Sequence, residues 1–484
     1  MKVAVRIDAS PAIGSGHAMR CLSLADALKE LGASVHFVAR DLPGHLAGII
    51  AARGHALLAL PAGSADEARD AQETLAACAP CDWIVVDHYA LGAAWEDTAR
   101  GVARVLAIDD LGRPHRAELV LDQNFHADAE RRYAESAGAG CTLLLGPRYA
   151  LLAPEFAAAR ARVRAREGAV RRLHVFLGGM DAANVTEVVL KAIARLEATD
   201  LQLDVVIGAG HPARERIEAL GAVLPGARVH VETRRMATLL ADADLAIGAG
   251  GSATWERCAL GVPTLGLCVA ENQREVLRHA ARAGLVHAPD IVADDVAAIA
   301  LHLAALLASE GLRHHLSRAG LAFVDARGAQ RVAAALRTAG LTIRRATTDD
   351  SPRLHAWRND SAVRAVSRNQ APIDGREHEA WLRDTLASPS RHLLIGERDG
   401  TSVGVVRFDV VDAAAEVSIH LAPEHIGRGE GAALLSAGEA WIRRETPGVA
   451  LLRAHVIGGN RPSHQLFEAA GYTASSTDYT KRTG

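Results

Sequence analysis

RIDASPAIGSGHAMRC, residues Arg6 to Cys21, is the stretch that decides the fold. The apolar run Val3 to Ile7 predicts the first strand of an α/β domain, and apolar residues at three- and four-residue spacing after the stretch predict a helix. A strand, a glycine turn and a helix leave backbone N–H groups and the positive end of the helix dipole at the strand's carboxyl edge. Gly14 and Gly16 belong to this turn, and His17 follows them directly. We therefore predict that an anionic or sugar ligand binds at this edge, where an imidazole can transfer protons at neutral pH.

The region up to about residue 165 alternates strand and helix patterns. Continuous apolar runs indicate strands that are buried on both faces, which favours a largely parallel sheet covered by helices. Ligands bind outside the carboxyl ends of such strands. We expect the polar clusters that follow three of these strands to share the rim with His17, although helix caps and turns are the alternative interpretation; the clusters are Asp87-His88-Tyr89, Asp109-Asp110 and Asp122-Gln123-Asn124.

A second α/β block follows and contains a glycine-rich loop after its fourth apolar run, Leu245 to Ile247. Gly250, Gly251 and Ser252 come before a helical pattern, which predicts a phosphate-binding loop. Glu256 lies one turn into that helix, where its carboxylate can accept hydrogen bonds from ribose hydroxyls. Structural glycines alone are the competing explanation for this loop.

The character of the sequence changes near residue 341. A new strand, two helical stretches and a meander of three strands are predicted, with Asp399-Gly400 as the turn of a hairpin. Another glycine loop, Pro423 to Leu435, follows the third strand of the meander. The fold class is therefore α/β, and we expect three domains, at residues 1–165, 166–340 and 341–484.

Composition excludes several classes of protein. A formal net charge of −3 and a pI of about 6.7 provide no field for holding a polyanion, so nucleic acid is not an expected partner. Neither a secretory signal nor a membrane-spanning stretch is apparent, so a cytoplasmic protein without membrane contact is expected; the sequence leaves the oligomeric state open. Cys78 and Cys81 form a CxxC pair that precedes a strand and has no second pair, which argues against a redox or zinc site.

Six motifs appear in an order that identifies a family resemblance. They are GSGHAMRC (14–21), VVDHYALG (85–92), IDDL (108–111), FLGGMDAAN (176–184), IGAGGSATWERCALGVPTL (247–265) and ENQ (271–273). Over roughly residues 1 to 340 the chain resembles the UDP-sugar hydrolases of pseudaminic acid biosynthesis, which are related to the MurG-type glycosyltransferases. The resemblance implies a GT-B type pair of Rossmann-like α/β/α domains with a cleft between them.

The same resemblance implies a metal-independent reaction in which water attacks the anomeric carbon of UDP-2,4-diacetamido-2,4,6-trideoxy-β-L-altropyranose and UDP leaves. His17 would orient or deprotonate the water. The remaining implied contacts are Asp87, His88 and Tyr89 on the sugar side, Gly250, Gly251, Ser252 and Glu256 around UDP, and Asn272 and Gln273 at the phosphates or the sugar.

Residues 342–484 resemble the GNAT superfamily of N-acetyltransferases, which use acetyl-CoA. The family's pyrophosphate loop matches Gly427, Gly429, Gly431 and Ala432, its pantetheine-binding strand matches Val417, Ser418 and Ile419, and its second cofactor motif matches Asn460 and Ser463. The basic or amide residue that usually begins the loop is Ile426 here, and Arg428 is the expected substitute. The family's usual acid, a tyrosine, is Phe467, so Glu416, His420 and Tyr472 are the candidates for proton transfer.

Together the two resemblances imply one polypeptide for two consecutive steps. The C-terminal domain would acetylate N4 of UDP-4-amino-4,6-dideoxy-N-acetyl-β-L-altrosamine, and the N-terminal pair of domains would then hydrolyse the product. The alternatives are a UDP-sugar glycosyltransferase with an attached acetyltransferase, and a hydrolase whose last domain only senses acetyl-CoA.

Overall fold

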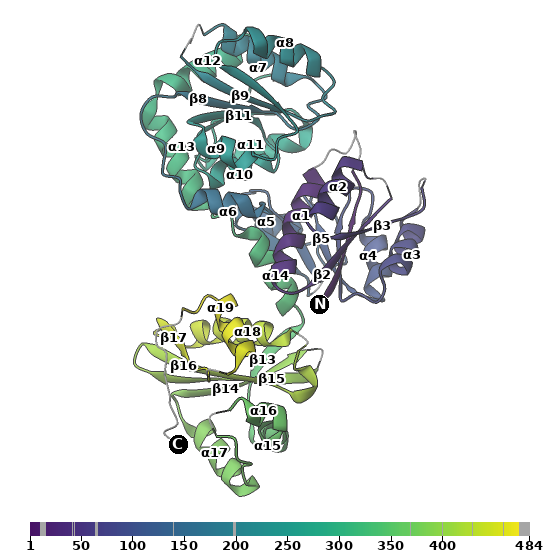
Figure 1. Cartoon of the computed structure of the whole chain (residues 1–484), viewed down its shortest axis with the longest axis vertical. Coiled ribbons are helices and arrows are strands. Elements are labelled where there is room, and N and C mark those ends of the chain that lie inside the picture. Colours follow the sequence, from purple (N-terminus) through teal and green to yellow (C-terminus); the bar gives the residue numbers. More distant parts are fainter. Residues whose placement is uncertain are drawn as a thin grey trace, which may run out of the picture. The chain divides into compact units, whose positions relative to one another are not determined.

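Two compact units make up the chain, Met1–Ala333 and Ala334–Gly484. The computed structural model (Figure 1) describes residues 1–9, 16–40, 42, 44–62, 66–138, 140–196, 200–367, 369–398, 400–427, 429–457 and 459–473. Gly14, Asp399 and Arg428 lie outside these residues. The three domain boundaries expected from the sequence stay predictions.

A seven-stranded sheet in the order β3-β2-β1-β4-β5-β6-β7 forms the first part of the N-terminal unit, and all its pairings are parallel. The strand order reverses between β1 and β4, and in a parallel sheet such a reversal is where ligands bind at the carboxyl ends of the strands. The elements are β1 (Lys2–Ile7), α1 (Gly16–Glu30), β2 (Ser34–Ala39), α2 (Gly44–Ala52), β3 (Ala56–Ala59), α3 (Glu67–Cys78), β4 (Trp83–Asp87), α4 (Ala93–Arg100), β5 (Arg104–Ile108), β6 (Leu119–Asp122), α5 (Ala129–Tyr133), β7 (Thr142–Leu145), η1 (Pro147–Tyr149) and α6 (Pro154–Arg160).

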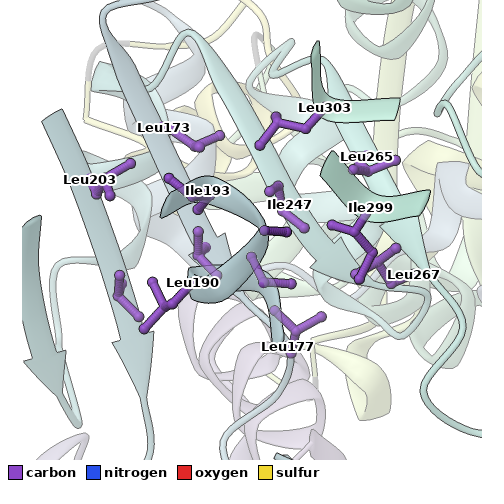
Figure 2. Packing of buried hydrophobic residues seen from close by; sticks show 14 of the residues in the cluster. Leu173, Leu177, Leu190, Ile193, Leu203, Ile247, Leu265, Leu267, Ile299 and Leu303 are labelled. Atoms are coloured by element: carbon purple, nitrogen blue, oxygen red, sulfur yellow. The ribbon is translucent and has the colours of Figure 1, made fainter. Parts of the chain in front are cut away.

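A second parallel sheet, in the order β10-β9-β8-β11-β12, has its reversal between β8 and β11. Figure 2 shows the apolar layer on this sheet, where Leu173, Leu203 and Ile247 of the strands meet Leu190 of α7 and Ile299 of α12. The elements are β8 (Arg172–Phe176), α7 (Val185–Ala194), β9 (Gln202–Ile207), α8 (Arg214–Val223), β10 (Ala227–Val231), α9 (Met236–Asp242), β11 (Leu245–Ala249), α10 (Ala253–Ala259), β12 (Thr264–Leu267), α11 (Glu271–Arg282), α12 (Val296–Ala308), α13 (Glu310–Phe323) and α14 (Gly328–Thr338).

The C-terminal unit contains a five-stranded mixed sheet in the order β13-β14-β15-β16-β17. Its first three pairings are antiparallel, and β16 pairs with β17 in parallel. The elements are β13 (Leu341–Arg345), η2 (Thr348–Asp350), α15 (Ser351–Asn359), α16 (Ser361–Ala365), α17 (Gly375–Ala387), β14 (Arg391–Arg398), β15 (Thr401–Val411), β16 (Ala414–Leu421), η3 (Pro423–His425), α18 (Glu430–Glu445), β17 (Leu451–Ala454) and α19 (Arg461–Ala469).

The expected fold class is confirmed, because two parallel-sheet, Rossmann-like α/β domains precede a domain with a mixed five-stranded sheet. One helix is shorter than the charged pattern from Pro154 to Glu167 predicts. It ends at Arg160, because Arg166 holds the following segment in place: its guanidinium donates to the carbonyl oxygens of residues 240, 241 and 243, and its N–H donates to Ser317.

Within the described residues, no single helix is long and apolar enough to cross a membrane. One pair, Val296–Ala308 with Glu310–Thr338, reaches that length and composition only when both are taken together, and it is bent by 89°. The first of these helices lies on the sheet of Figure 2, where Leu303 and Leu306 are fully buried.

Candidate active site

His17 and Asp87 meet at the reversal of the first sheet. His17 is the second residue of α1, and Asp87 is the last residue of β4, which pairs with β1, so both residues lie at the carboxyl edge of the sheet. The His17 Nδ1 atom lies 2.5 Å from Oδ1 of Asp87. This pairing agrees with the expectation that polar residues at these strand ends share one rim.

Arg20 completes the cluster from the next turn of α1. Its guanidinium donates two hydrogen bonds to Asp87, both of 2.6 Å, and the carboxylate is 1% exposed. Burial by itself would raise the pKa of Asp87, but the charges and hydrogen bonds of Arg20 and then His17 outweigh it and hold the pKa well below its ordinary value. Asp87 is therefore an anion that can only accept, which places the proton of His17 on Nδ1.

The position of Asp87 differs from the sugar-side role expected from the sequence. Both of its oxygens are occupied by Arg20 and His17, so its carboxylate orients the imidazole and is not available to a sugar hydroxyl. Sequence reasoning did not single out Arg20. Its position three residues after His17, on the same face of a helix, was the signal that could have found it.

Tyr89 packs against the imidazole and remains accessible. The rings of His17 and Tyr89 meet edge to face with centroids 4.7 Å apart, and Tyr89 is 42% exposed. The Tyr89 hydroxyl donates to Oδ2 of Asp110 at 3.2 Å, and Arg20 contacts the same oxygen at 3.3 Å. One hydrogen-bonded set thus joins the loops after β4 and β5.

His88 has both ring nitrogens engaged. Its Nδ1 accepts from the Ala90 N–H at 3.1 Å, so its proton is on Nε2, which lies 3.1 Å from Oδ2 of Asp8. Asp8 in turn binds the buried guanidinium of Arg6. This arrangement fixes the loop after β4 and leaves His88 no free nitrogen for substrate chemistry.

The second glycine loop has two free backbone donors. Within the described residues, the N–H groups of Gly251 and Ser252 have no partner, whereas the Gly250 N–H donates to Oε1 of Gln273 at 3.1 Å. A Cβ at Gly250 would lie 2.5 Å from Cγ of Leu277, so this glycine is required by packing. The residues predicted to contact the phosphates thus have two different roles. Gly250 and Gln273 hold the loop, while Gly251 and Ser252 can bind a ligand.

Glu256 has an unused carboxylate. It is partly buried, and its side chain has no hydrogen-bond partner in the part of the chain that the structure describes. Burial raises its pKa to about 7, Arg257 opposes this shift, and Glu155 adds to it. Burial destabilises the ionised carboxylate, and no described residue donates a hydrogen bond to it. It is therefore suited to accept hydrogen bonds from ligand hydroxyls.

Polar contacts connect the two sheets of the N-terminal unit beside this loop. Gln123 donates to Ser252 at 2.9 Å, and Arg132 contacts Glu275 at 3.1 Å. Between these elements lies a cavity of about 340 Å³ that residues of both sheets line: Asp110, Leu111, His126, Arg132, Glu271, Asn272, Arg274, Glu275 and Arg278. Two of the residues expected near a ligand from the sequence, Asp110 and Asn272, line this cavity.

The glycine loop of the C-terminal unit has a backbone that only glycine adopts easily. Gly427 and Gly429 have φ angles of 79°, and Gly429 is the residue before α18. A Cβ at Gly431 would meet nothing closer than 3.7 Å, so packing does not require glycine there. Ala432 also lies in the first turn of α18. The open space beside this turn would allow a phosphate group to approach the backbone closely.

The strand before this loop separates from its neighbour. Pairing between β16 and β17 ends at Val417 with Ala454, so Ser418 and Ile419 have no partner strand on that side among the described residues. An extended amide chain such as pantetheine can pair with a free strand edge of this kind. The second predicted cofactor motif is a helix cap here, because Asn460 accepts from the Ser463 N–H at 3.2 Å at the start of α19.

The candidates for proton transfer in the C-terminal unit differ in their surroundings. The Tyr472 hydroxyl donates to Glu439 at 3.0 Å, and burial followed by this carboxylate raises its pKa above the ordinary range. Among the residues that the structure describes, the Nε2 atom of His420 has no hydrogen-bond partner, and burial lowers the pKa of His420 to about 4, with Arg358 and Arg407 adding to this shift. His420 is therefore neutral at pH 7 and has a nitrogen that can accept a proton, while Glu416 on the same strand already has an interaction partner.

Among the described residues, no group of three or more His, Cys, Asp or Glu side chains is arranged to hold a metal ion. The Sγ atoms of Cys78 and Cys81 lie 3.7 Å apart as buried free thiols.

Comparisons with known proteins find similarities for both units. Residues 340–473 match the acetyltransferase (GNAT) domain model. The spore coat polysaccharide biosynthesis protein SpsG of Bacillus subtilis is 30% identical over 195 residues, which are 40% of this chain and 57% of that protein. The UDP-2,4-diacetamido-2,4,6-trideoxy-beta-L-altropyranose hydrolase of Campylobacter jejuni is 24% identical over 289 residues, or 59% of this chain and 97% of that protein.

An uncharacterized protein of Methanocaldococcus jannaschii is 21% identical over 492 aligned residues, which cover 98% of this chain and 96% of that protein, so the similarity extends through both units. The chain thus spans little more than half of SpsG but nearly the whole hydrolase. Both resemblances inferred from the sequence are confirmed: the chain joins a region similar to a UDP-sugar hydrolase to a C-terminal acetyltransferase domain of the GNAT family.

Proposed function

We propose that the chain is a bifunctional sugar-nucleotide enzyme. The C-terminal unit acetylates N4 of UDP-4-amino-4,6-dideoxy-N-acetyl-β-L-altrosamine with acetyl-CoA, and the N-terminal unit hydrolyses the resulting UDP-2,4-diacetamido-2,4,6-trideoxy-β-L-altropyranose to the free sugar and UDP. The observation that carries the hydrolase proposal is the His17 imidazole, fixed by a buried, ionised Asp87 at the sheet reversal.

The hydrolytic step follows from the tautomer of His17. With its proton on Nδ1 and donated to Asp87, the imidazole has its lone pair on Nε2, which accepts a proton from water. The water oxygen bonds to the anomeric carbon while the bond from that carbon to the diphosphate oxygen breaks. Asp87 stabilises the imidazolium that forms, because its negative charge is retained by Arg20.

The leaving UDP requires stabilisation of its negative charge. The free N–H groups of Gly251 and Ser252 supply two donors without any rearrangement of the protein. Glu256 accepts from the ribose hydroxyls, and Asn272 lines the neighbouring cavity on the sugar side. Tyr89, which packs on His17 and is exposed, contacts the sugar.

The acetyltransferase step uses the loop and the separated strand of the C-terminal unit. Gly427, Gly429 and Gly431 hold the pyrophosphate of acetyl-CoA, and the free edge at Ser418 and Ile419 pairs with pantetheine. The 4-amino nitrogen attacks the thioester carbonyl, the carbon–sulfur bond breaks, and CoA thiol leaves. His420 is the residue that we assign to receiving the proton of the amine, because its Nε2 has no hydrogen-bond partner among the described residues.

The test is a single incubation followed by ¹H NMR. The purified chain is mixed with the 4-amino UDP-sugar, with and without acetyl-CoA and without any acceptor sugar. The proposal predicts that acetyl-CoA is consumed, the diacetamido sugar nucleotide forms transiently, and the free sugar accumulates with an equal amount of UDP. A glycosyltransferase would leave the diacetamido sugar nucleotide intact, and an acetyl-CoA sensor would leave the 4-amino compound unacetylated.

A further inference from the structure

Gln123 reaches from the first sheet of the N-terminal unit to the glycine loop of the second. It follows β6 directly and is 2% exposed, and its Nε2 donates to the Ser252 hydroxyl at 2.9 Å. Neither the family resemblance nor the proposed mechanism uses this residue. The contact joins one sheet to the loop that we propose binds the phosphates, so its chemistry bears on that loop.

The orientation of the Gln123 amide is fixed by a second contact. Its Oε1 accepts from the backbone N–H of Leu151 at 3.0 Å, and a backbone N–H can only donate. The carbonyl end must therefore face Leu151, and the NH₂ end must face Ser252. A flipped amide would set two donors against each other at Leu151 and two acceptors at Ser252 unless the hydroxyl rotated.

This orientation determines what Ser252 can do. A hydroxyl has one hydrogen to donate and two lone pairs to accept with, and Gln123 occupies a lone pair. In the described residues the Ser252 hydroxyl makes no other hydrogen bond, so its hydrogen is free for a ligand. The backbone N–H groups of Gly251 and Ser252 are also free, so the loop presents three donors together.

We propose that Gln123 is a positioning residue that makes Ser252 a hydrogen-bond donor to a nucleotide phosphate. The inference rests on the proposed function, because it assigns the polarity of the UDP site. A deprotonated phosphate oxygen only accepts, so three converging donors favour it over a ligand group that needs an acceptor. Both sheets of the unit thus contribute to recognition of the nucleotide phosphates. The glycine loop after the second sheet binds them directly, and Gln123 of the first sheet acts on them through Ser252.

The test replaces one terminal atom of Gln123. Gln123→Glu keeps the oxygen that accepts from Leu151 but turns the other end into an acceptor, which captures the Ser252 hydrogen. Asn124→Asp is the matched control: it adds the same charge at the next residue, and its side-chain oxygen still accepts from the Trp255 ring N–H at 3.4 Å. UDP affinity is measured by calorimetry, and uridine, which lacks phosphate, is measured by ligand-observed NMR.

The inference predicts that Gln123→Glu weakens UDP binding by about ten- to a hundredfold, the usual range for a lost hydrogen bond to a charged group. Asn124→Asp should weaken it by only about threefold, because charge repulsion near the surface is screened. Uridine affinity should stay within about twofold in both variants, since neither change affects a group that we assign to the nucleoside. In a Ser252→Ala background, Gln123→Glu should reduce UDP affinity by no more than Asn124→Asp does.

Three results would overturn the inference. They are equal effects of Gln123→Glu and Asn124→Asp on UDP binding, an equal loss of uridine and UDP affinity, and a Ser252→Ala variant that binds UDP as tightly as the parent chain. The Ser252→Ala variant removes only a hydroxyl group, so it tests the inference even if Gln123→Glu does not fold. Absence of UDP binding by the parent chain would refute the proposed function itself, together with this inference.

Discussion

Asp87→Asn tests the link between the buried ion cluster and turnover. The substitution keeps the shape of the side chain but removes its charge and makes one terminal atom a donor. That donor must face either Arg20 or the protonated Nδ1 of His17, both of which also donate. The variant therefore loses a hydrogen bond in either orientation, or drives His17 into the tautomer whose Nε2 carries the proton and cannot accept one from water.

The magnitude follows from the burial of the group. Asp87 is 1% exposed and Arg20 is buried beside it, so among the described residues the variant leaves the Arg20 charge with only the longer contact to Asp110. Breaking one side of a buried ion pair costs about 3–5 kcal/mol of unfolding free energy. The turnover of the diacetamido UDP-sugar should fall by about 100- to 10,000-fold, the range for a general base in the wrong tautomer, while KM changes little.

Asp122→Asn is the matched control, because it makes the same change at the end of a nearby strand. Burial raises the pKa of Asp122 to about 7, whereas the pKa of Asp87 lies well below its ordinary value. The Tyr133 hydroxyl lies 3.0 Å from both Asp122 and Asp109, and it has one hydrogen, which the ionised Asp109 receives. A protonated Asp122 donates back to Tyr133, and an asparagine can do the same.

The two substitutions should therefore differ between pH 5 and pH 8: the loss of stability in Asp87→Asn should be nearly constant, whereas the effect of Asp122→Asn should depend on pH. The ionised Asp87 stabilises the fold above its unfolded pKa near 4, and this contribution is lost only as the pH falls through its lower folded pKa. Asp122 must take up a proton on folding, so it costs stability as the pH rises from about 4 to about 7, by at most about 4 kcal/mol. Asp122→Asn should remove this cost and gain stability at pH 8 relative to pH 5.

Urea unfolding at pH 5 and pH 8 and steady-state UDP release measure both effects. An Asp87→Asn variant with parental turnover, or one that raises KM and leaves kcat unchanged, would refute the positioning of His17 by Asp87. An Asp122→Asn variant that loses as much stability as Asp87→Asn at pH 8 would refute the assignment of the neutral carboxyl.

Three further predictions concern other contacts. Glu256→Ala should weaken UDP binding by about tenfold and leave binding of inorganic pyrophosphate unchanged, because the carboxylate is assigned to the ribose; calorimetry measures both, and equal losses would contradict it. Gly429→Ala should destabilise the C-terminal unit by about 1 kcal/mol and weaken CoA binding, because the φ angle of Gly429 is 79°. Gly375→Ala is the control, because Gly375 begins a helix and an added Cβ would have no atom within 4 Å. It should change neither the thermal unfolding nor the CoA titration. Tyr472→Phe should cost about 1 kcal/mol of stability through Glu439 and keep acetyl transfer within about twofold; a hundredfold loss of acetyl transfer would instead make this hydroxyl the acid.

The sequence predicted the elements around the site because the signals are local. Buried strands read as continuous apolar runs, and the glycine turn before His17 marked the start of α1. The rule that ligands bind at the carboxyl ends of strands was enough to bring Asp87 and Tyr89 to His17. The edge strand β3 is hard to predict from sequence, because its four residues, only partly buried, give too short a pattern.

The roles of individual side chains were harder to predict, because they depend on partners distant in sequence. Asp87 was expected to face the sugar, yet Arg20 lies 67 positions away and takes its carboxylate. Gln273 was expected at the ligand, yet it accepts from the Gly250 N–H. Periodicity and motif spacing carry no information on such pairings, which depend on how loops from different strands meet.

The central claim is that one imidazole activates the water, and His17→Asn tests it most directly. Pre-steady-state measurement of UDP release from the diacetamido UDP-sugar, with UDP affinity measured in parallel, separates chemistry from binding. The account predicts a fall in the release rate of about a hundredfold or more with UDP affinity within about twofold. A variant that releases UDP at the parental rate would contradict it.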